Sequence, residues 1–170
     1  IVHSLNVRSD NLYAESVLRF LSLSAHEKGS AEKGIDIIRK YWQNYEADSL
    51  ELFMYDGSGL ARNNKVSAKY LNCVLKETAR DSLIGEYFAQ TLPLAGKEGS
   101  VATFMKHGEL PGELRLKSGS MSDVHAYAGY YTTPQNRYAI VVMINNYTCT
   151  RAQLKQKIST LLTQVLSKKE

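Results

Sequence analysis

The chain has 170 residues, 44% of them hydrophobic and 22% charged, which is the composition of a globular protein with one sizeable core. No apolar run approaches the length of a membrane-spanning helix, and the net charge of +4 comes from basic residues scattered over polar helix positions, so we expect no transmembrane segment and no nucleic-acid partner. The four histidines, His3, His26, His107 and His125, lack the spacing of metal ligands, and we expect neither a metal nor a cofactor.

Helical patterns fill the first part of the chain. Apolar residues at helical spacing, namely Leu12, Val17, Leu18 and Leu21, predict a helix over residues 11–23. Gly29 breaks this pattern, and Ser30 is the expected N-cap of a second helix. The apolar stripe of that helix consists of Ile35, Ile38, Trp42 and Tyr45.

Turn residues punctuate the middle of the chain. Residues 52–55 favour a short strand, and the sequence Asp-Gly-Ser-Gly at 56–59 favours a turn. Ser67 is the expected start of a third helix. Residues 84–112 are interrupted by Gly and Pro, with a short helix expected near residues 101–105.

Three strands and a final helix are expected in the last third. One strand begins at Leu114, a second alternates with a period of two over residues 124–131, and the third, residues 138–145, is expected to be the most buried. Thr150 and Gln153 form a capping box before a helix with apolar residues Leu154, Ile158, Leu161, Leu162 and Val165. The predicted fold class is therefore α+β, an antiparallel three-stranded meander packed with helices and a C-terminal helix.

Two short motifs carry the candidate chemistry. Ser9-Asp10-Asn11 stands at the expected start of a helix, and Lys117-Ser118-Gly119-Ser120 lies on the first strand of the meander. S-D-N and K-T-G are, together with S-x-x-K, signature motifs of penicillin-binding proteins and class A β-lactamases. Each motif alone is weak, because the first is also typical of a helix N-cap and the second of a strand end with an exposed Lys.

Further segments of the chain are similar to those of a known protein family. Residues 55–64 read YDGSGLARNN, and residues 8–15, 92–96 and 128–130 read RSDNLYAE, LPLAG and AGY. From about Asn6 to Asn146 the chain resembles the low-molecular-mass carboxypeptidases of the D-Ala-D-Ala carboxypeptidase C, or peptidase S13, family. The resemblance implies part of the penicillin-binding (β-lactamase/transpeptidase-like) fold, with further strands beside residues 138–145.

The chain departs from the family's pattern in two small ways and one large one. Ser118 replaces the commoner Thr but keeps a hydroxyl, and Ala61 replaces the family's usual Ser. The family's nucleophile, in Ser-x-x-Lys, precedes the Ser9 motif, whereas Ser30 to Lys33 follows it here and is better explained as a helix cap. We therefore expect residues 1–170 to be the C-terminal part of a single transpeptidase-like domain that begins within a longer sequence, lacks the N-terminal part with this motif and is inactive alone.

The resemblance implies hydrolysis of a D-Ala-D-Ala bond through an acyl-enzyme, with Ser9, Asn11 and Lys117 as catalytic residues. Ser9 passes a proton to the departing amine, Asn11 holds the substrate backbone, and Lys117 places a positive charge near the substrate carboxylate. The residues expected to bind substrate are Ser118, Gly119, Ser120, Met121 and Leu60. The Ser120 N–H is an expected oxyanion donor, whereas Met121 and Leu60 are as readily explained by core packing.

The expected partners are a peptidoglycan stem peptide ending in D-Ala-D-Ala, β-lactams in the intact enzyme, and either the missing N-terminal half or a second copy. One of the last two, or a rearranged segment of the chain itself, should cover residues 138–145, because an open apolar strand edge recruits other chains. The resemblance implies a periplasmic or cell-envelope location. The alternative functions are a non-catalytic peptidoglycan- or partner-binding module of the same fold and a β-lactamase-type hydrolase.

Overall fold

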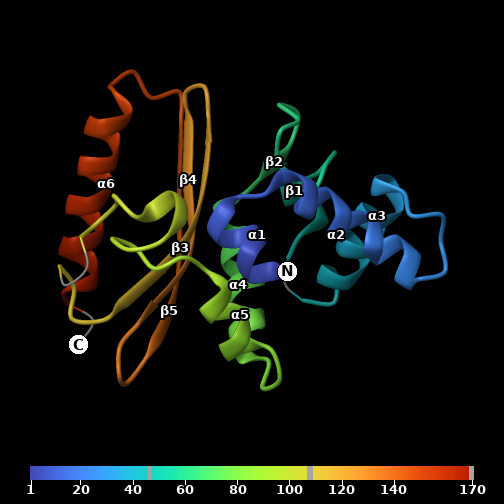
Figure 1. The fold of residues 1–170 in the computed structure, drawn as a ribbon, viewed down its shortest axis with the longest axis horizontal. Coiled ribbons are helices and arrows are strands. Elements are labelled where there is room, and N and C mark those ends of the chain that lie inside the picture. The colour runs from blue at the N-terminus through green and yellow to red at the C-terminus, as the bar shows by residue number, and fades with distance from the viewer. Residues whose placement is uncertain (46, 107–108, 169–170) are drawn as a thin grey trace.

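A helical part and a sheet part lie side by side in a computed structural model that describes residues 1–45, 47–106 and 109–168 (Figure 1). The helical part contains α1 (Val2–Arg8), α2 (Asn11–Ser24), α3 (Ala31–Trp42), α4 (Ala68–Arg80) and α5 (Gly85–Thr91), with a short ribbon of β1 (Leu52–Phe53) and β2 (Lys65–Val66). The sheet part contains β3 (Glu113–Met121), β4 (Val124–Thr132), β5 (Arg137–Asn145) and α6 (Arg151–Leu166). The expected α+β class is confirmed. None of the described helices combines the length and apolarity that crossing a bilayer requires.

The sheet is an antiparallel meander with the strand order β3-β4-β5. Lys117 lies opposite Ala128 in the first strand pair, and Ala128 lies opposite Val141 in the second. A two-residue turn joins β3 to β4, and its second residue, Asp123, has a φ of 56°, a left-handed conformation that tight hairpins favour. The first strand of the predicted meander therefore extends to Met121.

Helix α6 covers one face of the sheet. Its predicted capping box is present, and its buried side chains recur every four residues, at Leu154, Ile158, Leu162 and Leu166. The ring of Phe104 stacks on that of Tyr127 from β4, with 4.2 Å between their centroids, so the loop before β3 contributes to this core. Leu161 and Val165 are exposed, because they lie beside the buried row rather than on it.

Helices α4 and α5 cover the other face of the sheet. Tyr130 of β4 is buried there, and its hydroxyl donates a hydrogen bond to the backbone oxygen of Leu75 in α4 at 2.7 Å. Burial raises the pKa of Tyr130 to about 12, so the phenol remains a donor at neutral pH. The ring of Phe88 from α5 meets the ring of Tyr130 edge-on, with 6.3 Å between centroids. These contacts fix the helical part against the sheet.

The expectation that the third strand is the most buried is wrong. Along β5, every side chain from Arg137 to Ile144 is only partly buried. The reason is topological, because β5 is an edge strand with β4 as its one strand neighbour within the described residues, whereas β4 is central. Within the described residues no strand pairs with the outer edge of β5, although the Asn72 side chain of α4 donates a hydrogen bond to the Ala139 oxygen at 3.4 Å on that side.

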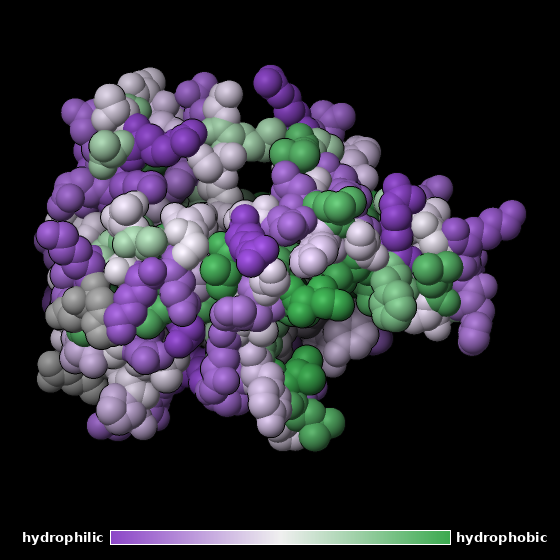
Figure 2. Space-filling view, viewed as in Figure 1, coloured by the Kyte–Doolittle hydropathy of each residue, from purple (hydrophilic) through white to green (hydrophobic). Residues whose placement is uncertain are grey.

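The expectation that Leu12 and Val17 lie on the buried face of α2 also needs correction. Leu12 and Val17 are exposed on α2, because the helix turns Leu18 toward α3 instead. At that contact a Cβ on Gly34 would lie 2.2 Å from the Leu18 oxygen, so only glycine permits the close approach. Figure 2 shows apolar side chains gathered on the visible face over α1 and α2.

The segment between α4 and β3 is more ordered than its Gly and Pro content suggests. The sequence pattern does not predict helix α5, which is only seven residues long. The short helix expected near residues 101–105 is a 3₁₀ turn, Gly99–Val101, because the chain turns there against α1 and the sheet instead of propagating a helix.

Candidate active site

The junction between α1 and α2 holds the first motif in an uncommon backbone conformation. Ser9 closes α1 with φ 53° and ψ 48°, in the left-handed region that residues with a side chain rarely adopt. Asp10 caps α2, and its carboxylate accepts a hydrogen bond from the Tyr13 N–H at 3.0 Å. The capping function therefore belongs to Asp10, which leaves the Ser9 hydroxyl available for another partner.

Lys117 reaches this junction from β3. Because side chains alternate along a strand, the burial of Leu114 and Leu116 against α6 turns Lys117 to the opposite face, toward the helical part. Its Nζ donates hydrogen bonds to Ser9 Oγ at 2.5 Å and to the backbone oxygen of Ser118 at 2.7 Å. The first bond joins residues 108 positions apart and confirms that the two motifs are in direct reach.

The two hydrogen-bond acceptors of the Lys117 ammonium, a hydroxyl and a backbone oxygen, are both neutral. Burial lowers the pKa of Lys117, because its ammonium loses solvation that two neutral acceptors replace only in part. Within the described residues no carboxylate forms a salt bridge with it. A partly buried cation without an anionic partner favours the binding of an anion from outside.

Ser100 joins this cluster, although the sequence motifs did not include it. Its hydroxyl accepts a hydrogen bond from Ser118 Oγ at 2.7 Å. Gly99 brings the 3₁₀ turn of Ser100 against α1, since its φ is 52° and a Cβ would lie 2.3 Å from the Val7 oxygen. The signal in the sequence is the Gly-Ser pair shortly after the LPLAG segment, because such a glycine often marks a close backbone approach.

The backbone of β3 offers donors and acceptors at an edge away from β4. The Leu116 N–H donates to the Pro93 oxygen at 3.0 Å on that side. In an antiparallel strand every second residue shares this orientation, so Ser118 and Ser120 also turn their backbone groups to this edge. The Ser120 N–H therefore points away from β4, which is the orientation that a donor to a ligand needs.

The other motif residues lie beside these atoms along the chain. Asn11 opens α2 two residues after Ser9, and its side chain is exposed. Gly119 is exposed on β3, and a Cβ at that position would meet nothing closer than 4.0 Å, so packing does not require the glycine. Met121 is half-buried at the hairpin, on the same face of β3 as Lys117 but four residues away.

The loop that contains Leu60 is fastened to the first turns of α2. The backbone N–H groups of residues 57 and 58 both donate to the Glu15 carboxylate at 2.9 Å. Burial acts to raise the pKa of Asp56, but hydrogen bonds from Asn64 and from backbone N–H groups outweigh it and lower this pKa. Leu60 itself is 62% exposed, so core packing does not account for it.

Ser30 is a helix cap, as expected. Its side chain accepts a hydrogen bond from the Lys33 N–H at 3.1 Å at the start of α3. Lys33 is exposed. Figure 1 shows α3 at the end of the molecule remote from β3, so this Ser-x-x-Lys sequence lies far from Lys117.

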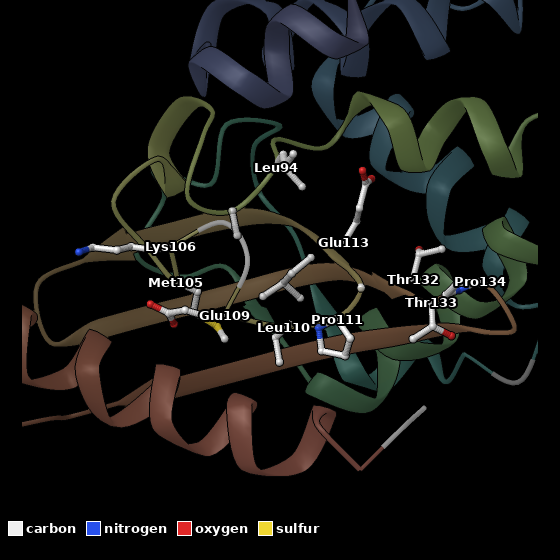
Figure 3. A pocket seen from close by; sticks show the side chains of 13 residues that line it. Leu94, Met105, Lys106, Glu109, Leu110, Pro111, Glu113, Thr132, Thr133 and Pro134 are labelled. Carbon is white, nitrogen blue, oxygen red and sulfur yellow. The ribbon is translucent and has the colours of Figure 1, made fainter.

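A cavity of about 430 Å³ lies at the start of β3 rather than at the motif residues (Figure 3). Its lining includes Leu94, Met105, Lys106, Glu109, Leu110 and Glu113. None of the predicted site residues lines it. In the part of the chain that the structure describes, no group of three or more His, Cys, Asp or Glu residues is placed to hold a metal ion; His107 lies outside the described residues.

Known proteins match almost the whole chain. Residues 1–168 match the model of the D-Ala-D-Ala carboxypeptidase 3 (S13) family. The chain is 26% identical over 144 residues to the D-alanyl-D-alanine carboxypeptidase of Actinomadura sp. (strain R39), which covers 82% of this chain and 27% of that protein. It is 27% identical over 161 residues to D-alanyl-D-alanine carboxypeptidase DacB of Haemophilus influenzae, with 91% and 33% covered. This chain thus spans about a third of the length of the curated relatives it matches.

Solved structures share the fold. The crystal structure of penicillin-binding protein 4 (DacB) from Haemophilus influenzae superposes with a TM-score of 0.82 at 24% identity, over 97% of this chain and 39% of that one. The same protein complexed with a novel β-lactam gives a TM-score of 0.78 at 25% identity, over 97% and 40%. The expectation of a partial penicillin-binding fold is confirmed.

Proposed function

Because the chain belongs to the D-Ala-D-Ala carboxypeptidase 3 (S13) family, we propose that it forms part of a serine-type D-Ala-D-Ala carboxypeptidase or endopeptidase that cleaves peptidoglycan peptides through an acyl-enzyme. The observation that carries this proposal is the 2.5 Å contact between Lys117 Nζ and Ser9 Oγ. It joins the two motifs in a site that has further hydroxyls, an outward backbone N–H and a cation to which no carboxylate of the described residues forms a salt bridge. Such a set suits a peptide that ends in a free carboxylate.

Ser9 and Lys117 act on the leaving group. A lysine whose pKa is lowered by burial exchanges a proton with a neighbouring hydroxyl more readily than an exposed lysine does. The Ser9 oxygen can then hand a proton to the departing amine as the peptide bond breaks. The exposed amide of Asn11, two residues further along, holds the substrate backbone and orients the lysine beside the nucleophile.

The terminal carboxylate of the substrate binds between Lys117 and Ser118. Ser100 is a positioning residue, because its hydrogen bond fixes the Ser118 hydroxyl. The peptide adds along the outer edge of β3, where the Ser120 N–H serves as an oxyanion donor. Gly119 leaves this edge accessible. Two exposed or half-buried apolar side chains flank the substrate, Leu60 and Met121.

The attacking serine comes from sequence outside residues 1–170. Two observations support this part of the proposal: Ser30 caps a helix remote from Lys117, and the curated relatives are longer than this chain. Residues 1–170 are then the C-terminal part of a single transpeptidase-like domain, and alone they have no activity. We assign the intact protein to the periplasm or cell envelope, because its proposed substrate, peptidoglycan, is located there.

Acylation of the full-length protein by a fluorescent penicillin tests the proposal. We expect a covalent adduct on the wild type and a roughly 10- to 100-fold slower reaction for Lys117→Met, because hydrogen bonds to charged groups contribute about 1.5–3 kcal/mol. Lys65→Met, a change at an exposed lysine in β2, is the matched control and should leave the rate unchanged. Peptidoglycan binding without any adduct would favour the non-catalytic module, and rapid β-lactam turnover would favour a β-lactamase-type hydrolase.

A further inference from the structure

A groove of about 370 Å³ lies between α2, α3 and the C-terminal end of α4. Its lining has an apolar part, made up of Leu21, Ile37, Ile38 and Ile84. None of the residues of the candidate active site lines it. The chemistry proposed above therefore leaves this groove without a function.

Three aromatic rings line the same groove. Tyr41 and Trp42 meet edge-on at 88°, with 5.1 Å between their centroids. The ring of Tyr45 is tilted against both, at 5.5 Å from Tyr41 and 5.3 Å from Trp42. Rings at such angles form a corner rather than a flat stack, and Tyr41 remains 53% exposed. Aromatic faces of this kind attract cations.

Two carboxylates complete the lining. Glu77 and Asp81 are four positions apart at the C-terminal end of α4, where the helix dipole adds negative potential. Asp81 is held in place by the N–H groups of residues 83 and 84, at 2.8 Å and 3.1 Å. Glu77 pairs with Arg80 at 2.5 Å, but Arg80 is 67% exposed, so solvent weakens this ion pair.

The negative charge acts on the aromatic side of the groove. The pKa of the Tyr45 phenol is raised, first by its hydrogen bond with the Tyr41 hydroxyl, which lies 3.3 Å away, and then by repulsion between the two phenols when both are ionised. Partial burial and the charges of Glu77 and Asp81 raise it further. The charges of Glu77 and Asp81 in particular disfavour an additional negative charge in the groove.

We propose that this groove binds an alkylammonium group, with its positive nitrogen between the aromatic corner and the two carboxylates and its alkyl substituents on the apolar lining. An anion would meet the repulsion of Glu77 and Asp81, and a neutral apolar molecule would gain nothing from either charge. The groove volume lies within the range of about 300–1,000 Å³ typical of small-molecule sites. The ligand class is a quaternary ammonium compound or a lysine side chain.

Trp42 allows a direct test, because it is the only Trp in the 170-residue chain. Its fluorescence is measured during titration with choline and with 3,3-dimethylbutan-1-ol, which has the same shape with carbon in place of nitrogen, at constant ionic strength. We expect a saturable change with choline and roughly five- to thirtyfold weaker binding of the neutral alcohol, since a cation–π contact contributes about 1–2 kcal/mol. N-acetyl-lysine amide forms a third arm, and tighter binding of it than of choline would identify a lysine side chain as the source.

Two substitutions locate the binding site. Asp81→Asn keeps an acceptor for the N–H groups of residues 83 and 84 but removes the charge, and Glu77→Gln provides an independent second variant. Each should weaken choline binding several-fold, while Glu32→Gln on an exposed turn of α3 should not change it. Equal responses to choline and to the alcohol, no response to any cation, or affinities unchanged in both variants would overturn the proposal.

Discussion

Ser9 carries a side chain in a backbone conformation that favours glycine. Its φ of 53° costs about 1–2 kcal/mol relative to a right-handed conformation, and such strain persists where surrounding structure over-determines it. The Asp10 cap on one side and the Lys117 bond on the other hold the hydroxyl in this place. The strain is therefore best understood as part of how the site aims Ser9 Oγ at the lysine.

Replacing Ser9 by glycine should separate stability from activity. Ser9→Gly relieves the backbone strain and should raise the free energy of unfolding by about 0.5–1 kcal/mol, but it removes the hydroxyl and should slow penicillin acylation of the full-length protein by about 100-fold or more. Urea unfolding and adduct formation measure the two effects. Ser9→Ala is the control, which should lose activity equally without gaining stability. Full activity in either variant would contradict the function proposed for Ser9.

The pKa of Lys117 predicts how substrate binding depends on pH. Lys117 must be protonated to pair with a carboxylate, and burial lowers its pKa in the free site. The KM of the full-length enzyme for a peptide ending in D-Ala-D-Ala should therefore increase as pH rises through this lowered pKa, below the range where an exposed lysine titrates. Lys117→Arg keeps its charge throughout and should show a flat profile. A flat wild-type profile would argue against pairing between Lys117 and the carboxylate.

At the scale of elements, the contact between β4 and α6 contains an unpaired histidine. His125 is 3% exposed, and neither of its ring nitrogens has a hydrogen-bond partner within the described residues. Burial lowers its pKa first, and the charges of Lys155 and Arg151 from α6 lower it further. The ring of Tyr127 meets it edge-on at 4.8 Å. The folded state therefore favours the neutral form of His125.

Acid should weaken this contact. Because the folded-state pKa of His125 lies below its ordinary value of 6.5, the unfolded chain binds the proton first, and stability falls as pH drops below 6.5 until the folded-state pKa is passed. The slope due to this one group is at most about 1.4 kcal/mol per pH unit. Urea unfolding across this range should be less pH-dependent in His125→Phe, which keeps a ring but cannot be protonated. Identical slopes in both proteins would contradict the prediction.

At the scale of the whole molecule, β5 is an edge strand of the sheet. Within the described residues its outer edge has no strand neighbour, and its faces are only partly buried. The expected covers, namely the missing half, a second copy or a segment of the chain itself, stay predictions; the described contact at this edge is the hydrogen bond from Asn72 of α4 to the Ala139 oxygen. Backbone alternation through the sheet turns the Val141 N–H to this edge and the Val142 N–H to β4.

Proline substitutions at neighbouring positions distinguish the N–H groups on the outer edge of β5 from those that bond to β4. If the 170-residue polypeptide associates through β5, it should elute above its 19.1 kDa monomer mass in size exclusion with light scattering, and Val141→Pro should reduce that association, because proline removes an edge N–H. Val142→Pro, one residue away, should instead unfold the sheet by removing a bond to β4. A stable wild-type monomer in solution would mean that these residues form a complete domain.

Local chemistry is what the sequence by itself determined. Periodicity located α2, α3, α4, α6 and the meander, side-chain caps marked where helices begin, and two motifs selected Ser9 and Lys117. Each of these depends on residues a few positions apart, so a short stretch of sequence contains the information. The same holds for Ser30, because the Gly before it and the helical pattern after it already predict an N-cap, and the Ser30 side chain indeed caps α3.

Only the tertiary structure decided which of these residues meet. The bond between Lys117 and Ser9 spans 108 positions, Ser100 joins Ser118 through a turn packed on α1, and the edge position of β5 follows from strand order rather than from its Ile and Val content. The same long-range packing exposed Leu12 on α2. Contacts of this kind arise from how helices and strands pack across the fold, and hydrophobic periodicity specifies that an apolar face is buried without specifying against what.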